Sequence, residues 1–177
     1  MTRQPPQLDP YDADVLAELV RGRRVLLVGA PGTGTSSLVE RLAEHLPGAS
    51  TSVVDADPGS PSFGPPAAVA LGHWTDEWVV DALEGVGTLD GGKFRLAVVG
   101  AVSRLLRDVE TETLLIDAPG VVRGQIAREF VPELASITRS DLVLYLVDGP
   151  GDATLYADLA AMGAEVRLVA AAERAHS

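Results

Sequence analysis

Residues 23–46 read RRVLLVGAPGTGTSSLVERLAEHL and hold three signals in a row. A short apolar run over Arg23–Val28 is typical of a strand buried in a parallel sheet. The segment GAPGTGTS, residues 29–36, follows it as a glycine-rich loop. After the loop, apolar residues recur on one face of a helix that we expect over Ser36–Leu46. A strand, a glycine-rich loop and a helix in this order predict a phosphate-binding turn in an α/β sheet.

The loop matches the motif G-x-x-x-x-G-K-[ST] at every defined position except the lysine, which is Thr35. Its glycines let consecutive backbone N–H groups point inward, and the following helix directs its positive end at the same place. Ser36 has the hydroxyl that holds Mg²⁺ in such loops. The alternative interpretation is a strand-to-helix turn with no ligand. The residues that we predict to bind a nucleotide are Gly29, Ala30, Pro31, Gly32, Thr33, Gly34, Thr35, Ser36 and Ser37.

Thr35 changes the expected chemistry more than the expected binding. The motif's lysine reaches the β- and γ-phosphates and neutralises charge as the γ-phosphoryl group moves. Removing one such donor typically lowers the rate on the order of a hundred- to a thousandfold. Arg123, in a later loop, is the nearest candidate by topology for a substitute cation.

Two acidic segments follow predicted strands. The strand at Ser52–Val54 leads into Asp55 and Asp57, and a strand at Thr113–Ile116 leads into Asp117. Ligands of open α/β sheets bind outside the carboxyl ends of the strands, so both segments should face the phosphate loop. Such a carboxylate lies on the water shell of Mg²⁺ or beside an attacking hydroxyl. Each aspartate alone is also a common turn residue, but three that converge favour function.

The rest of the chain alternates strand and helix signals. We expect further strands at Ala68–Leu71, Phe94–Val99, Leu142–Val147 and Glu165–Val169, and helices at Tyr11–Val20, 76–84, 101–109, 125–137 and 153–162. Pro132 should kink or split one of these helices. The alternation predicts an α/β fold of P-loop NTPase type, in which a mostly parallel sheet lies between two helical layers. Residues 1–10 are typical of a flexible arm, and residues 11–177 of a single nucleotide-binding domain.

Charge and composition exclude several classes of protein. The 177 residues hold 25 acidic and 14 basic side chains, a formal net charge of −11, and no cysteine. An acidic chain is not a general nucleic-acid coat, so any nucleic-acid contact would be local. The absence of cysteine excludes disulfides and cysteine-ligated metals. The apolar runs are far shorter than the roughly 20 residues of a membrane helix. The N-terminus does not resemble a signal peptide, and we expect a cytoplasmic protein.

Four further segments carry a family resemblance: DADPGSPSFGPPAAVALG (55–72), FRLAVVGAVS (94–103), LLIDAPGVVRG (114–124) and DLVLYLVDGPGDATLYADL (141–159). With the phosphate loop, they resemble the polynucleotide 5′-hydroxyl kinases over about residues 24–170. This family includes the RNA kinase subunit of pre-mRNA cleavage complexes and the ribosomal-RNA-processing kinases. The resemblance implies Mg²⁺-dependent transfer of the ATP γ-phosphate to a 5′-hydroxyl of RNA or DNA, with GTP as a second candidate nucleotide.

The resemblance also implies roles for single residues. Asp55 would accept the proton of the 5′-hydroxyl. By its place in the chain, and not by the resemblance, Arg123 would partly replace the lost lysine. Ser36, Asp57 and Asp117 would form the metal site. The sequence departs from the family at Thr35 for lysine, Ser60 for glutamine, Arg104 for proline and Val121 for tryptophan. The family's lid, which supplies phosphate-clamping arginines, would begin about where the sequence stops.

Two other functions compete with a kinase. The first is a non-catalytic nucleotide-binding switch or adaptor that acts through a protein partner, which Thr35 favours. The second is a GTPase, because Asp117 to Gly120 fit a D-x-x-G switch. No [NT]-K-x-D motif follows the strand at Leu142–Val147, so guanine specificity has no support.

Overall fold

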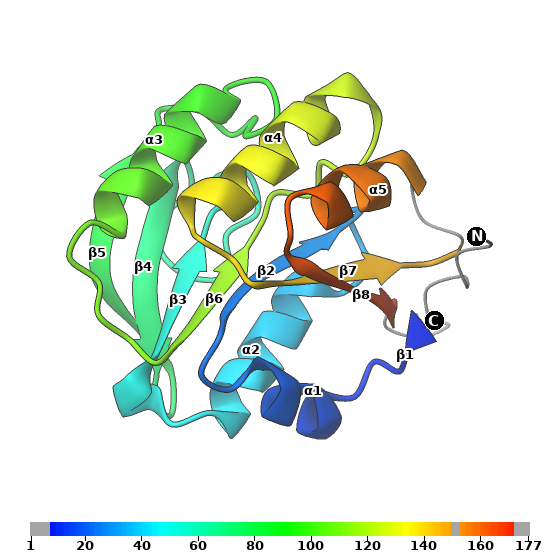
Figure 1. Ribbon diagram of the computed structural model, residues 1–177. Helices are drawn as coiled ribbons and strands as arrows, with labels where there is room; N and C mark the ends of the chain where they lie inside the picture. The colour runs from blue at the N-terminus through cyan, green and yellow to red at the C-terminus, as the bar shows by residue number, and fades with distance from the viewer. Residues whose placement is uncertain (1–7, 150–152, 172–177) are drawn as a thin grey trace, which may run out of the picture.

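An eight-stranded sheet forms the centre of the computed structural model, which describes residues 8–149 and 153–171 (Figure 1). The strands are β1 (Leu8–Asp9), β2 (Arg24–Gly29), β3 (Thr51–Asp55), β4 (Ala68–Trp74), β5 (Trp78–Gly85), β6 (Thr113–Asp117), β7 (Leu142–Val147) and β8 (Glu165–Ala170). Their order across the sheet is β1-β8-β7-β2-β6-β3-β4-β5. The pairs β3–β4 and β4–β5 are antiparallel, and the other neighbours are parallel.

Helices cover both faces of the sheet (Figure 1). One layer holds α1 (Ala13–Val20) and α2 (Thr35–His45), and the other holds α3 (Arg95–Leu105), α4 (Gly124–Ile137) and α5 (Ala153–Ala161). A short 3-10 turn, Gly48–Ser50, leads from the α2 side into β3. The predicted α/β fold, with a mostly parallel sheet between two helical layers, is confirmed.

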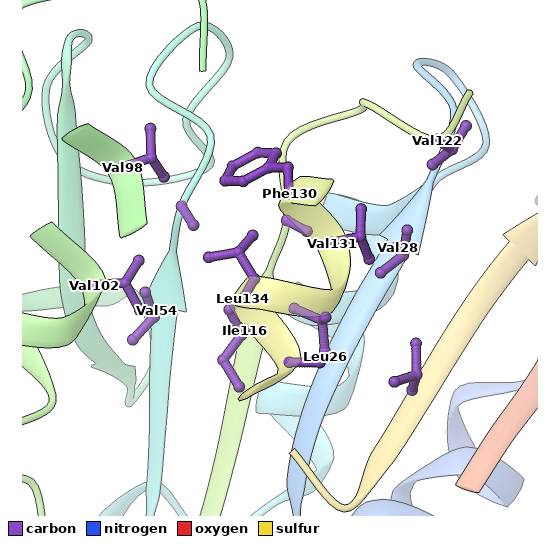
Figure 2. Close-up of a cluster of buried hydrophobic side chains, with 14 of the residues drawn as sticks. Leu26, Val28, Val54, Val98, Val102, Ile116, Val122, Phe130, Val131 and Leu134 are labelled. Atoms are coloured by element: carbon purple, nitrogen blue, oxygen red, sulfur yellow. The ribbon is translucent and has the colours of Figure 1, made fainter. Parts of the chain in front are cut away.

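The core consists of two apolar layers, one on each side of the sheet. Val25 and Leu27 of β2 pack with α1 and α2, whereas Leu26 and Val28 pack with α3, α4 and α5. Figure 2 shows the second layer, where Phe130 and Leu134 of α4 lie over the sheet. Because β2 is buried on both faces, its sequence is a continuous apolar run rather than an alternating one.

The prediction of a helix at 76–84 is wrong, because this segment forms β5. Its apolar residues are spaced as in an amphipathic helix, since Trp78 and Val79 are followed by Ala82 and Leu83. The pairing with β4 contains a register shift opposite Leu71, and this bulge interrupts the alternation that would mark a strand. The β-branched valines and the pairing partner therefore outweigh the helical spacing.

The strand predicted at Phe94–Val99 is also wrong, because these residues open α3. The apolar run is short enough to fit either element, which periodicity alone cannot separate. In the structure it continues into the predicted helix at 101–109 as one helix that ends at Leu105. The buried residues lie at helical spacing: Val98, Ala101, Val102 and Leu105.

Pro132 does not split α4, which is continuous over Gly124–Ile137. One face of the helix is buried around the proline, with Phe130, Val131 and Leu134 almost fully enclosed. Packing on this scale offsets the roughly 3 kcal/mol that an internal proline costs.

The chain enters the sheet earlier than the sequence predicts. Leu8 and Asp9, which we placed in the flexible arm, form β1 and pair with Leu168 and Val169 of β8. Residues 1–7 of that arm lie outside the described residues. Among the described residues, the helices are too short and too polar to cross a lipid bilayer.

Candidate nucleotide-binding site

The phosphate loop connects the end of β2 to the start of α2. Gly32 and Gly34 have φ angles of 83° and 91°, in the left-handed region that favours glycine. Gly34 is the N-cap of α2, which begins at Thr35, one residue before its predicted start at Ser36. A Cβ atom on Gly29 would collide with the hydroxyl oxygens of Thr33 and Thr35. The loop therefore closes tightly on itself, which only glycine permits at these positions.

The two threonines of the loop differ in their contacts. Thr33 is buried and its hydroxyl donates to the carbonyl of Ala30 at 2.8 Å. The hydroxyls of Thr33 and Thr35 lie 3.4 Å apart. Thr35 thus lies at the lysine position of the motif with a short neutral side chain, and it brings no positive charge to the loop.

Two carboxylates lie side by side next to the loop. Asp55 ends β3 and Asp117 ends β6, and the two residues are partners in the parallel register of these strands. Both are almost fully buried, with exposed fractions of 1% and 2%. The register places two acidic groups together at the carboxyl edge of the sheet, as the sequence predicts.

Asp55 is held by backbone donors. Its Oδ1 accepts from the N–H of Asp57 at 3.0 Å, and its Oδ2 accepts from the N–H groups of Ser62 and Phe63. Burial raises the pKa of Asp55 to about 6, although these three hydrogen bonds lower it in part. The carboxylate of Asp55 therefore fixes the backbone of the acidic segment that follows β3.

The carboxyl group of Asp117 has fewer hydrogen-bond partners than that of Asp55. Its Oδ2 is buried and has no hydrogen-bond partner among the described residues, and the same holds for the hydroxyl of Ser62. Burial raises the pKa of Asp117 to about 8, and the nearby charge of Asp55 adds to the effect. The neighbouring hydroxyls of Ser36 and Ser62 lower that pKa in part. A cation or a hydrogen-bond donor in this place would relieve the unpartnered oxygen.

A pocket of about 380 Å³ opens between the loop and the acidic segments. It is lined by Gly29, Ala30, Pro31, Gly32, Gly34, Thr35, Ser36, Ser37, Asp57, Gly59, Ser60, Asp117, Ala118 and Gly120. The structure thus brings together the predicted metal residues and all predicted nucleotide-binding residues except Thr33, which faces inward. None of the lining residues is lysine or arginine.

The two predicted catalytic residues lie outside this lining. Asp55 is behind the pocket wall, whereas Asp57 lines the pocket and is half-buried. Arg123 is exposed at the start of α4, three residues after Gly120, which lines the pocket. The chain's own contacts therefore do not direct the Arg123 guanidinium into the pocket.

Some contacts of this region were not predicted from the sequence. Ser62 donates its backbone N–H to Asp55, and Gly120 packs so closely on Pro31 that a Cβ atom would touch the proline ring. The turn-forming runs around both residues are visible in the sequence, but their partners are not. Tyr11 makes a third such contact, since its hydroxyl donates to the carbonyl of Gly34 at 3.0 Å.

The residues present suit Mg²⁺ by their chemistry. They offer oxygen donors, namely the hydroxyl of Ser36, the carboxylate of Asp57 and the unpartnered Oδ2 of Asp117. Mg²⁺ prefers such ligands, and it usually takes one or two carboxylates with water and substrate phosphates. The described residues hold no cluster of three or more acidic or histidine side chains that would ligate a metal alone.

Two solved structures share this fold. The chain superposes on a structure of the wild-type Clp1p–Pcf11p complex with a TM-score of 0.68 and 13% sequence identity, covering 93% of this chain and 49% of the other. A second structure concerns the extended interface between Pcf11p and Clp1p and ATP loss in a point mutant. It matches with a TM-score of 0.66 and 13% sequence identity, covering 93% of this chain and 49% of the other. No family model and no curated protein matches the sequence. The chain shares the α/β fold of these structures and spans about half the length of the chains that it matches.

Proposed function

We propose that this domain binds a nucleoside triphosphate, preferably ATP, together with Mg²⁺ in the pocket beside the phosphate loop. The observation that carries the proposal is the meeting of the loop with Asp57 and Asp117 around one cavity. A volume of about 380 Å³ is in the range of small-molecule sites, which is roughly 300–1,000 Å³. Backbone N–H groups and the start of α2 favour phosphate groups there.

The pocket also defines the role of the metal. Its lining has the carboxyl groups of Asp57 and Asp117 and no basic side chain, so the negative charge of a bare triphosphate would meet no compensating positive charge. Mg²⁺ supplies that compensation when it is bound. Binding should therefore require Mg²⁺ far more strictly than in a loop that has the lysine.

The reaction that we propose is phosphoryl transfer to a 5′-hydroxyl of RNA or DNA, as the sequence resemblance implies. The hydroxyl oxygen attacks the γ-phosphorus, the bond to the β-phosphate oxygen breaks, and the hydroxyl proton passes to a carboxylate. Asp55 has that role by resemblance, while Asp57 is the carboxylate that lines the pocket. Asp57→Asn and Asp55→Asn, compared in one assay, would separate the two.

A second candidate is a nucleotide-binding adaptor that acts through a protein partner without catalysis. The lack of any lysine or arginine in the pocket lining favours it, because such a cation stabilises the moving phosphoryl group. The two candidates share the binding step and differ in turnover.

The first test is the melting temperature of the full chain with Mg·ATP, with Mg·GTP, and with each nucleotide plus EDTA. A nucleotide at a hundred times its Kd stabilises by about 2.7 kcal/mol, or roughly 5–11 °C at this size. We expect a shift of this order with Mg·ATP and none with EDTA. Ser36→Ala should reduce the shift, whereas the control Ser103→Ala, on the exposed side of α3, should keep it. Absence of a shift with both nucleotides would overturn the proposal.

A further inference from the structure

The pocket beside the phosphate loop has room for phosphates but no evident place for a base. Its lining consists of glycine, alanine, proline, serine, threonine and aspartate, with no aromatic side chain. Bases are usually held by stacking on flat side chains and by hydrogen bonds to their edges. The nucleoside of a bound nucleotide must therefore extend to another surface.

Tyr11 brings an aromatic ring to the edge of that pocket. Its hydroxyl donates to the carbonyl of Gly34, which lines the pocket and lies 23 residues further along the chain. Burial raises the pKa of Tyr11, so the hydroxyl stays protonated and keeps donating. The Arg41 guanidinium carbon lies 6.0 Å from the centre of the ring.

The segment that carries Tyr11 is anchored on both sides. Before it, Asp9 accepts two hydrogen bonds from the guanidinium of Arg167, both at 2.8 Å. After it, the carboxylate of Asp12 caps α1 by accepting from the N–H groups of Asp14 and Val15. The ring is therefore held beside the phosphate loop rather than left at the end of a loose arm.

A hollow of about 460 Å³ begins at this ring and follows α2. It is lined by Tyr11, Asp12, Ala13, Asp14, Arg41, Glu44 and His45. Ser37, which lines the phosphate pocket, lies four residues before Arg41 and seven before Glu44, so the three share one helix face. At the helical rise, Arg41 is about 6 Å and Glu44 about 10 Å along the axis from Ser37. One nucleoside extends over a similar length.

We infer that the hollow formed by Tyr11, Arg41 and Glu44 holds the base and ribose of the nucleotide whose phosphates bind the phosphate loop. This inference rests on the proposed function. The Tyr11 ring offers a stacking surface, Arg41 a donor and Glu44 an acceptor for an exocyclic amino group. At the far end His45 Nε2 lies 2.8 Å from Asp14 Oδ1.

The test compares Mg·ATP with Mg·tripolyphosphate, which has the phosphates but no nucleoside, by calorimetric titration of the full chain. Tyr11→Leu removes the ring, and Tyr11→Phe keeps the ring but loses the hydroxyl. Tyr156→Leu on α5 is the matched control, because Tyr156 packs on the opposite face of the sheet. Melting temperatures without ligand check that each variant is folded.

We expect the parent to bind ATP on the order of tenfold more tightly than tripolyphosphate, from one stacked base. Tyr11→Leu should bring the ATP affinity down to that of tripolyphosphate, with the latter unchanged within about twofold. Tyr11→Phe and Tyr156→Leu should preserve the preference.

Three results would overturn the inference in distinguishable ways. If the parent binds neither ligand, the proposed function fails and the inference with it. If the parent binds both but Tyr11→Leu keeps the preference for ATP, the hollow is not the base site. If Tyr11→Leu weakens both ligands equally, Tyr11 only positions the loop. Should Tyr11→Leu not fold, Arg41→Gln, on the exposed face of α2, carries the same comparison.

Discussion

The two walls of the pocket are built by opposite means. The phosphate loop is made mainly of backbone, with glycines in left-handed conformations, and the side chain of Thr33 turns inward. The facing wall is acidic: Asp57 and Asp117 line it, and Asp55, the register partner of Asp117, lies behind it. The loop alone supplies only dipoles, whereas the acidic wall supplies carboxyl groups, of which Asp117, with its pKa raised to about 8, is ionised only in part at neutral pH. The loop can therefore attract phosphate groups, but a cation must bind between the phosphates and the acidic wall.

The largest expected effect comes from giving the loop wall a cation. Thr35→Lys should raise phosphoryl transfer to a 5′-hydroxyl oligonucleotide, or ATP hydrolysis, on the order of a hundred- to a thousandfold over the parent. Radiolabel transfer from γ-labelled ATP measures it. Ser37→Lys adds the same charge to the lining at another position and should not reproduce the gain. If Thr35→Lys binds nucleotide but stays inactive, the adaptor interpretation gains over the kinase.

The next effect comes from removing charge from the acidic wall. The folded-state pKa values of Asp55 and Asp117, about 6 and about 8, lie above the unfolded value of about 3.9. The folded state therefore binds more protons than the unfolded state, and stability should fall as pH rises from about 4 to about 8. Without Mg²⁺ or nucleotide, we expect the melting temperature to drop by roughly 5 °C or more over that range.

Asp117→Asn should flatten that dependence, because the amide stays neutral at every pH. The variant should melt above the parent at pH 8.5 and near it at pH 5, while it binds Mg·ATP more weakly. A thermal scan in buffers from pH 5 to 8.5 measures the first effect. An unchanged slope in Asp117→Asn would show that the buried pair does not cause it.

A smaller effect tests the backbone of the loop wall. Gly34→Ala forces a β-carbon into a left-handed conformation and should destabilise the fold by about 1–2 kcal/mol, or roughly 2–8 °C. Gly22→Ala is the matched control, because Gly22 has a φ of 70° with open space around it. The two variants should melt alike, but only Gly34→Ala should weaken tripolyphosphate binding in a calorimetric titration.

The smallest effect lies outside both walls. Asp9→Asn removes the charge that pairs with Arg167 and should lower the free energy of unfolding by about 1 kcal/mol or less, because the pair is partly exposed. Denaturant unfolding measures it. Glu18→Gln, in the exposed pair with Arg21, should cost less still. If Asp9→Asn lowers the free energy of unfolding by more than this, the short strand β1 contributes more to the stability of the fold than we expect.

Much of this architecture was readable in the sequence because local signals and tertiary contacts agree there. The run Arg23–Val28 followed by glycines predicts β2 and the loop, and strands before Asp55 and Asp117 predict the acidic wall. The sequence does not reveal that these two aspartates are register partners, since register is a property of two strands. The segment of β5 was predicted wrongly as a helix, because a bulge opposite Leu71 interrupts the alternation of apolar and polar residues that marks a strand.

The site contacts that escaped prediction join residues far apart in the chain. Tyr11 meets Gly34 across 23 residues, and neither side of that hydrogen bond has a sequence signature of the other. The resemblance implies that Asp55 is the base, yet three backbone donors and deep burial direct its carboxylate inward. Burial depth depends on the path of the acidic segment, which local spacing does not determine.

The position of β2 in the sheet also has a consequence for biosynthesis. This strand lies between β6 and β7, so its hydrogen-bonding partners begin at Thr113 and Leu142. On a translating ribosome, β2 and its loop emerge about 90 residues before the first of these partners. During that interval an apolar strand has two unpaired edges, which exposes the nascent chain to aggregation and favours chaperone contact. The nucleotide pocket therefore forms only late in synthesis, after the carboxyl half has left the exit tunnel.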